Sequence, residues 1–327
     1  MNLFKIVQNR TNKRKQNDNP YQDVGAVLLF VFLLPYVISC LWGHIGEETE
    51  VLMVNMQKET KYLDDQYEII LSEEWGMRTL TMEEYLTQKL ALVMPQAENG
   101  TLYEQEALKA QAILLRTELW TMIEDDETIY CNITQKADTK IQEEYETAVH
   151  ETDGIILTYQ GEPMKAAYFA VSNGQTRDAG QVWGSDSYPY LKKVECKQDI
   201  LAKDYQSRVE VEKEKFYHLA GEILEIEGVE GGDWQELEFI YDESGYVTKV
   251  VLKEASCSGE AFRYAFGLNS ACFEMEWEDS KVIFQVKGVG HGFGMSQYGA
   301  NQRALSGENF AEILENYFFQ AELVKIE

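Results

Sequence analysis

The stretch KGVGHGFGMSQYGANQRALSG, from Lys287 to Gly307, is the most unusual part of this sequence because four glycines alternate with other residues. A predicted strand, Val282–Lys287, runs into it, and a predicted helix from about Met295 to Leu305 follows. Glycine adopts positive φ without steric cost and lets other groups approach its backbone closely. The glycines at 288, 290, 292 and 294 therefore predict a tight loop that lies close to a ligand.

Polar side chains surround this loop. Hydroxyl and amide groups form hydrogen bonds to sugar hydroxyls, and an aromatic ring stacks against the flat face of a sugar. The glycine spacing misses the third glycine of a dinucleotide-binding loop, so that class of site is excluded. A tight strand-to-helix turn with a surface histidine is the alternative that the pattern leaves open. The candidate sugar-binding residues are His291, Ser296, Gln297, Tyr298 and Asn301.

Helix signals lie on both sides of the centre of the chain. Thr81 with Glu84 forms a capping box, which predicts a helix over Met82–Met94 that Pro95 ends. A second helix, from Glu104 to about Met122, carries apolar residues on more than one face and is expected to be buried between layers. Near the C-terminus, Asn309 with Glu312 predicts the start of another capped helix.

Strand signals alternate with these helices. Tyr67–Leu71 favours a strand, and two hairpins are predicted, Ile155–Tyr159 with Lys165–Val171 and Glu236–Tyr241 with Tyr246–Leu252. The charged segment 202–230 is predicted to be helical and is a candidate insertion. Hairpins mixed with helices, without a βαβ rhythm, indicate an α+β fold around one core.

The N-terminal part predicts a membrane anchor. Val24–Trp42 contains 19 residues without a charge, long enough to span a hydrocarbon core of ~30 Å. Five Lys/Arg precede it against two Asp, so the positive-inside rule predicts a cytoplasmic tail at 1–23 and an anchor at 24–43. A polar, acidic stalk at 44–64 and an extracellular domain at 65–327 are expected to follow.

Two processing alternatives compete with an uncleaved anchor. A cleaved signal peptide fits less well, because the first 23 residues are long and polar. The stretch Val37-Ile38-Ser39-Cys40 resembles a lipoprotein cleavage box, which would leave a lipidated Cys40. The domain faces outward in either case.

The charge distribution excludes one class of partner. The formal net charge is −27, and residues 1–43 carry +3, so the outward domain is strongly acidic. Proteins that bind nucleic acid do so mainly by neutralising phosphates with Lys and Arg. A nucleic-acid partner is therefore not expected.

Several blocks of sequence together resemble the stage II sporulation protein D / amidase-enhancer family. The closing block is GHGFGMSQYGAN, and the opening blocks are TMEEYLTQKLALVMP and EALKAQAILLRT. Between them stand DGIILTYQGEPMKAAYFAVSNGQT, VWGSDSYPYLKKVE and FRYAFGLNSACF. These blocks follow the family's order over roughly residues 81–325, which is more specific than any one of them alone.

This resemblance implies a protein directed at peptidoglycan. Sporulation members of the family are lytic transglycosylases, in which one glutamate protonates the glycosidic oxygen and then deprotonates the 6-hydroxyl of the sugar. The family motif has this glutamate immediately before Met-Pro, where Val93 stands in this chain. Valine cannot transfer a proton. An alignment without a gap offers Glu98 instead, although Glu98-Asn99-Gly100 has the character of an exposed turn.

The same resemblance implies a substrate-binding groove. Lys109, Gln111 and Arg116 match the family's helix, and the spacing of seven positions from Lys109 to Arg116 puts both cations on one face. Ser172 and Thr176 match the family's hairpin loosely. We expect Lys109 and Arg116, the segment Ser172–Thr176 and the glycine-rich loop to converge around one groove. The alternative for the two cations is a solvated face or ion pairs with the many carboxylates of this chain.

No metal or other cofactor is expected. Some family members bind zinc through two Cys and a His soon after the EALKAQ helix, and Cys131 stands at about the first of these positions. Gln135 and Lys136 stand where the other two ligands would be. A structural zinc site needs four ligands, so the sequence predicts none.

The favoured interpretation is a membrane-anchored, outward-facing protein that binds peptidoglycan glycan strands, with weak or lost catalysis. Two alternatives stay open. The first is an active lytic transglycosylase that uses Glu98 or another carboxylate. The second is an amidase enhancer that acts through protein contacts. Expected partners are glycan strands, a cell-wall amidase or other sporulation proteins, and the membrane.

Overall fold

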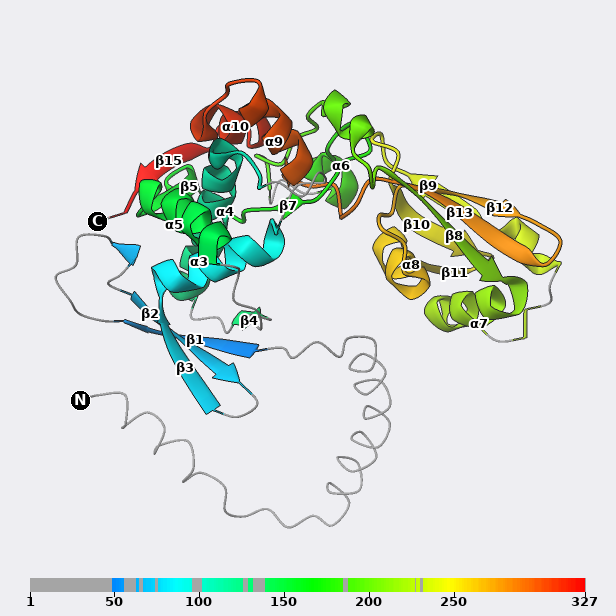
Figure 1. Cartoon of the computed structure of the whole chain (residues 1–327). Helices are drawn as coiled ribbons and strands as arrows, with labels where there is room; N and C mark the ends of the chain where they lie inside the picture. The colour runs from blue at the N-terminus through cyan, green and yellow to red at the C-terminus, as the bar shows by residue number, and fades with distance from the viewer. Residues whose placement is uncertain are drawn as a thin grey trace, which may run out of the picture. The chain divides into compact units, whose positions relative to one another are not determined.

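The computed structural model places every described residue in one compact unit, Glu48–Glu327. Helices and several small sheets alternate along this unit (Figure 1), which confirms the α+β prediction. The predicted anchor, Val24–Trp42, lies outside the described residues. Among the described helices, none is both long and apolar enough to cross a membrane. The described residues are 49–55, 63–64, 67–73, 76–95, 102–125, 129–131, 139–184, 188–226, 228–229 and 232–326.

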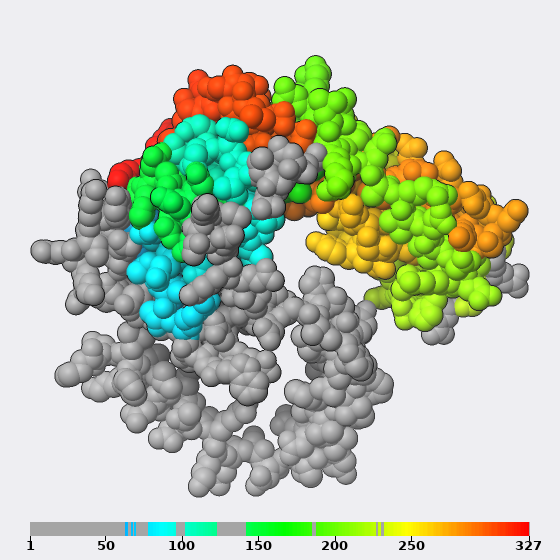
Figure 2. Space-filling model, viewed as in Figure 1, coloured from blue at the N-terminus to red at the C-terminus, as the bar shows by residue number. Residues whose placement is uncertain are grey.

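A bundle of helices forms the first hydrophobic core. Helix α4 is surrounded by the other helices and by a strand, and apolar residues on all its sides are buried. In the space-filling view, the orange-red residues of α9 and α10 lie directly against the teal residues of α4 (Figure 2). The predicted burial of this helix between layers is therefore confirmed. The bundle consists of α3 (Met82–Val93), α4 (Gln105–Asp125), α5 (Thr139–Glu151), α9 (Gln297–Leu305) and α10 (Phe310–Tyr317).

Both predicted capping boxes are present. The Thr81 hydroxyl accepts a hydrogen bond from the Glu84 N–H, and the Glu84 carboxylate accepts one from the Thr81 N–H. Asn309 and Glu312 form the same reciprocal pair at the start of α10. Each cap satisfies backbone N–H groups that the first turn of a helix leaves free, so these helix starts are fixed by local sequence.

A four-stranded antiparallel sheet has the strand order β3-β2-β1-β4, with three strands before the bundle in the chain and β4 directly after α4. Its strand β1 lies inside the predicted stalk, so the stalk prediction is wrong for residues 49–55. The prediction followed the acidic composition of 44–64 as a whole. It overlooked the apolar run Val51–Val54, which pairs with β2. The strands are β1 (Thr49–Asn55), β2 (Tyr67–Glu73), β3 (Gly76–Thr81) and β4 (Ile129–Cys131).

The first predicted hairpin is shorter than expected. Strand β5 (Ile155–Tyr159) pairs with β6 (Glu162–Pro163) through a turn at Gln160-Gly161, where both residues have positive φ. The predicted second strand over Lys165–Val171 is wrong. Its central part, β7 (Tyr168–Phe169), pairs in parallel with β14 (Met295–Ser296), a partner far along the chain. On its other side β5 pairs with β15 (Glu322–Lys325).

A second hydrophobic core is built by residues 206–287, so the described part of the chain has two cores and not the predicted one. Two three-stranded sheets, β11-β10-β9 and β12-β13-β8, enclose an aromatic cluster with α7 and α8. The predicted hairpin around 242–245 is confirmed. The strands and the helix α8 are β9 (Glu238–Tyr241), β10 (Val247–Leu252), β11 (Ala255–Ser258), β12 (Phe273–Trp277), β13 (Lys281–Lys287) and α8 (Gly259–Phe266).

The segment 202–230, predicted to be helical, is only half helix. Residues Gln206–Glu212 form strand β8, which pairs with β13 along its whole length, and α7 (Lys213–Leu224) follows. The exposure of β8 alternates along QSRVEVE, a period of two that the high charge of the segment obscured. Both elements contribute to the second core.

A buried ion pair joins the start of the domain to the bundle. The Arg116 guanidinium is fully buried and forms hydrogen bonds with both carboxylate oxygens of Asp64 at 2.6–3.0 Å. It also donates to Thr152 and to the backbone carbonyls of Val149 and Ile155. All donors of Arg116 are therefore used inside the protein.

We expect the Asp64→Ala variant to be strongly destabilised, because the Arg116 charge would remain buried without its partner. Breaking a buried pair in this way typically costs ~3–5 kcal/mol, and unfolding in guanidinium chloride should reveal a loss of this order. The matched control is Glu195→Ala, which removes an exposed pair with Lys197 and should change stability little. Similar, small losses in both variants would contradict the structural role of Asp64.

Candidate functional site

The glycine-rich loop lies directly on the backbone of residues 167–173. Val171 and Val289 exchange two backbone hydrogen bonds of 3.0 and 2.7 Å. A Cβ added at Gly294 would lie 2.0 Å from the Ala167 carbonyl oxygen, and φ is positive at all four glycines of Gly288–Gly294. The predicted glycine conformation is thus confirmed, and the close approach is to the protein's own backbone.

His291 is held in this loop as a neutral hydrogen-bonding group. Its Nδ1 accepts a hydrogen bond of 3.1 Å from the Phe293 N–H, and its ring lies 5.7 Å from that of Phe169. Burial, together with the positive charges of Arg263 and Arg177, lowers the pKa of His291 to about 4. The imidazole is therefore uncharged at neutral pH, and because Nδ1 accepts a hydrogen bond, the ring proton lies on Nε2, which is a donor.

Three helices bring Gln111, Gln297 and Val93 together. The Gln297 side-chain amide, at the start of α9, donates to the side-chain oxygen of Gln111 at 3.1 Å. It also donates to the backbone oxygen of Val93 at 3.2 Å. Gln111 Nε2 is buried and has no hydrogen-bond partner among the described residues. Gln111 therefore meets the first residue of α9 at the end of α3. Asn301 joins α9 to the start of α4, because its side-chain oxygen accepts from the Glu104 N–H at 2.8 Å.

Ser172 and Ser296 converge on a buried carboxylate, Asp199, which the sequence did not single out. Asp199 Oδ2 accepts from the Ser172 N–H at 2.8 Å and from the Ser296 hydroxyl at 2.6 Å. Burial raises the pKa of Asp199, and these hydrogen bonds offset part of the rise. No local signal could have identified Asp199, because its partners lie 27 and 97 residues away.

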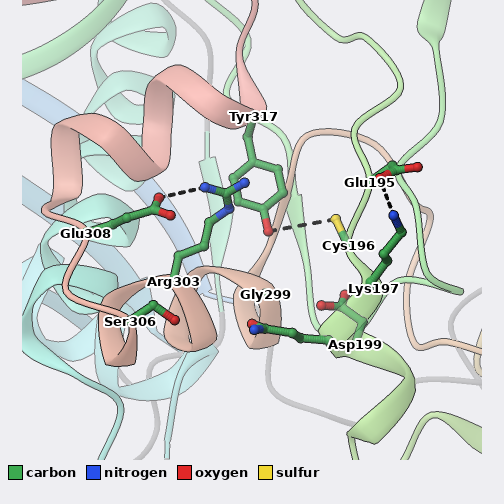
Figure 3. A pocket seen from close by; sticks show the side chains of 10 residues that line it. Glu195, Cys196, Lys197, Asp199, Gly299, Arg303, Ser306, Glu308 and Tyr317 are labelled. Carbon is green, nitrogen blue, oxygen red and sulfur yellow. Dashed lines mark hydrogen bonds and ion pairs between the residues drawn. The ribbon is translucent and has the colours of Figure 1, made fainter.

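A pocket of about 260 Å³ adjoins Asp199, as Figure 3 shows. Asp199 Oδ1 has no partner among the described residues, and a Cβ at Gly299 would lie 2.9 Å from it. The Cys196 thiol lies 3.8 Å from the Tyr317 hydroxyl, and burial raises the pKa of this thiol to about 12. Cys196 is therefore protonated at neutral pH and is a poor nucleophile.

Arg116 does not line a cleft, which corrects the expectation for this residue. Its side chain is fully buried and bound to Asp64, because the segment before β2 folds back onto α4. Lys109 pairs with Glu106 at 2.7 Å and with Glu151 at 2.5 Å, as the alternative of ion pairs anticipated. Its role in binding stays a prediction.

Thr176 and Tyr298 are anchored to the backbone. The buried Thr176 hydroxyl donates to the Lys192 carbonyl and accepts from the Val194 N–H, so it fixes the local chain path. Tyr298 is partly buried, and its N–H donates to the Ala170 carbonyl at 3.0 Å.

Glu98 lies outside the described residues, as does the region of Gln135 and Lys136. Among the described residues no group of three or more His, Cys, Asp or Glu could hold a metal ion.

Arg177 is a residue that the sequence did not single out and that links the two cores. It pairs with Asp242 at 2.7 Å and with Glu260 at 3.4 Å, both in the second core. Its guanidinium also lies 4.5 Å from the centre of the Phe293 ring and donates to the His291 carbonyl. Arg177 therefore fixes the position of the glycine-rich loop relative to the second core.

Comparison with known proteins gives a consistent result. Residues 72–159 match the SpoIID family, described as stage II sporulation protein. The chain is 31% identical to stage II sporulation protein D of Bacillus subtilis and 29% identical to that of Bacillus amyloliquefaciens, over 74% of this chain and of each relative. It is also 24% identical to the amidase enhancer of Bacillus subtilis, over 65% of this chain and 37% of that protein. Because the first of these relatives is 31% identical over 74% of both chains, the chain belongs to the stage II sporulation protein D family.

Proposed function

We propose that this protein binds the glycan strands of peptidoglycan and has weak or lost cleavage activity. The observation that carries the proposal is the contact of Gln297 with Gln111 and with the Val93 carbonyl. Side-chain amides at the junction of three helices are suited to recognising sugar hydroxyls and acetamido groups. Val93 ends α3 at the position where the sequence resemblance expects the catalytic glutamate.

An unsatisfied donor supports binding at this junction. Gln111 Nε2 is buried without a partner among the described residues, and such a group typically costs ~1–3 kcal/mol. A ligand oxygen that accepts from it, after a small rearrangement, would remove this cost. The neutral His291 and the rigid glycine-rich loop add hydrogen-bonding groups that need little reorganisation on binding.

The loss of the carboxyl group at Val93 supports weak catalysis. General acid catalysis typically contributes about 10²–10⁴-fold to a rate, and an isopropyl group provides none of it. Asp199 is not an obvious substitute, because one of its oxygens is already bonded to Ser172 and Ser296. Binding without efficient cleavage is therefore the simplest outcome for this arrangement.

A second candidate function, active cleavage, is favoured by Glu118. This residue lies seven positions after Gln111, two helical turns along the same face of α4. Lys89, which is one turn before Val93 on α3, acts electrostatically on Glu118. Burial raises the pKa of Glu118, whereas Lys89 and Lys165 lower it, and a raised pKa suits a proton donor.

The third candidate is regulation of an amidase, favoured by the similarity to a protein named amidase enhancer. This role would require a protein contact surface and no sugar site. Binding of the purified chain to denuded glycan strands in a sedimentation assay separates it from the two glycan-based functions. Absence of binding would make amidase regulation the leading candidate.

The catalytic prediction concerns three variants of the full chain. We expect near-background release of anhydro-muropeptides from denuded glycan strands by the native protein, because Val93 cannot donate a proton. Val93→Glu should give measurable release, whereas Glu98→Gln and Glu118→Gln should leave the native level unchanged. Chromatography of the released products is the measurement.

Two outcomes would contradict this expectation. Robust native turnover that Glu118→Gln abolishes would establish the active-enzyme candidate with Glu118 as its acid. Robust turnover that Glu98→Gln abolishes would assign the same role to Glu98. If Val93→Glu stays inactive while glycan still binds, the site has diverged at more positions than Val93, and a purely binding function is strengthened.

We also propose that Val24–Trp42 anchors the chain with residues 44–327 outside the cell, since basic residues precede this apolar stretch and acidic residues follow it. Protease added to intact protoplasts should then degrade the domain and spare only the anchored N-terminal fragment. Loss of the signal from an antibody to the domain is the measurement. Degradation only after lysis would refute this orientation and with it access to peptidoglycan.

A further inference from the structure

Trp183 is a large aromatic side chain held at the surface beside the glycine-rich loop. It is 52% exposed and ends the short helix α6 (Ala179–Trp183). Asp178 caps the start of this helix, and Gly184, with a φ of 61°, closes its end through a hydrogen bond to the Gly180 carbonyl. Both ends of α6 are thus fixed, and with them the backbone from which Trp183 projects.

Phe293 covers one face of the Trp183 ring, and Tyr188 contacts the ring edge-to-face. Its centre lies 4.5 Å from that of Phe293 with an angle of 24° between the planes, a stacked arrangement. Tyr188 contacts it in an edge-to-face geometry at 5.6 Å. Phe293 itself is buried and lies 4.5 Å from the Arg177 guanidinium. The second face of a rigidly held indole therefore accounts for the exposure of Trp183.

We propose that this exposed face of Trp183, backed by Phe293, is a stacking platform for one pyranose ring of a glycan strand. The inference rests on the proposed glycan-binding function and names a second contact of the same binding region. A pyranose has one face of C–H groups and a rim of hydroxyls, which suits a single flat aromatic ring. Because the ring is already immobile, little conformational entropy is lost on binding.

The size and surroundings of the patch favour a sugar over an apolar protein or membrane partner. Of the aromatic rings around it, Phe293 and Tyr190 are buried and Tyr188 is partly buried, so Trp183 presents one ring rather than a broad apolar surface. Protein and membrane contacts generally use apolar patches of several hundred Å². Its exposed neighbours in the chain are uncharged: Gln181, on α6, is polar, and Gly184, directly after α6, is small. Such neighbours are expected beside sugar hydroxyls.

The platform lies within reach of the junction at Val93. Phe293, against which Trp183 stacks, is four residues before Gln297, which donates to the Val93 carbonyl. Four residues of fully extended chain span at most about 14 Å, so the Cα atoms of Phe293 and Gln297 cannot be farther apart. The two places are therefore close enough for a strand of a few sugars to span the distance between them.

The test measures binding of a soluble β-1,4-linked N-acetylglucosamine tetramer, and of denuded glycan strands, to the full chain by calorimetry and by tryptophan fluorescence. We expect Trp183→Ala to weaken binding about tenfold or more, and Trp183→Phe to retain affinity within about threefold. In Trp183→Phe the fluorescence change on binding should largely disappear, because the indole that meets the sugar is gone. Tyr264→Ala is the matched control, since Tyr264 is 71% exposed on α8 of the second core, and its affinity should be unchanged.

The outcomes separate this inference from the proposed function. If the native chain and Trp183→Ala bind equally well, the platform is refuted and glycan binding stands. If Trp183→Ala fails to fold, Trp183→Phe decides, because a native-sized fluorescence change in that variant would refute the contact. If the native chain binds neither probe, both the platform and the proposed function fail.

Discussion

The glycine-rich loop lies against the chain segment 167–173, with Val289 hydrogen-bonded to Val171 and Met295, directly after the loop, to Ala167, and this contact positions the residues of the candidate site. Side chains at Gly288 and Gly294 would collide with the backbone of that segment, so the loop can follow its path only with glycine there. The loop also connects β13 of the second core to α9 of the first. Because α9 begins directly after it, the loop determines where Ser296 and Gln297 lie. The glycines thus make this region rigid rather than flexible.

The site that results is rich in hydrogen-bonding groups and poor in available acids. Gln111 and Gln297 meet at the end of α3, where Val93 contributes only its backbone oxygen to the network. Asp199 is deeply buried and holds Ser172 and Ser296 in place. A carboxylate used in this way stabilises the loop and is poorly suited to proton transfer. Our proposal of glycan binding with weak cleavage rests on this arrangement, and Glu118 is the candidate acid of the alternative.

Local signals predicted local structure well. The two capping boxes and the turn at 242–245 were correct because their partners are three or four residues apart. The predictions failed where a partner was distant. Residues 165–171 do not extend the hairpin because Met295–Ser296 competes for Tyr168–Phe169, and residues 49–55 form a strand because β2 is available to pair with them. Composition alone assigned both segments wrongly.

The sequence by itself determined the α+β class, the family and the conformation of the glycine-rich loop, since each depends on residue identity and short spacing. Only the tertiary structure decided what the charged residues do. Arg116 and Lys109 share a helical face, yet Arg116 is buried against Asp64 and Lys109 is paired with two glutamates. Asp199 is bonded to Ser172 and Ser296, and Trp183 stacks on Phe293. These partners lie far from them along the chain and are brought close only by folding. A charge or a ring has no fixed role until folding sets its neighbours and its exposure to water, and these are properties of the packed chain.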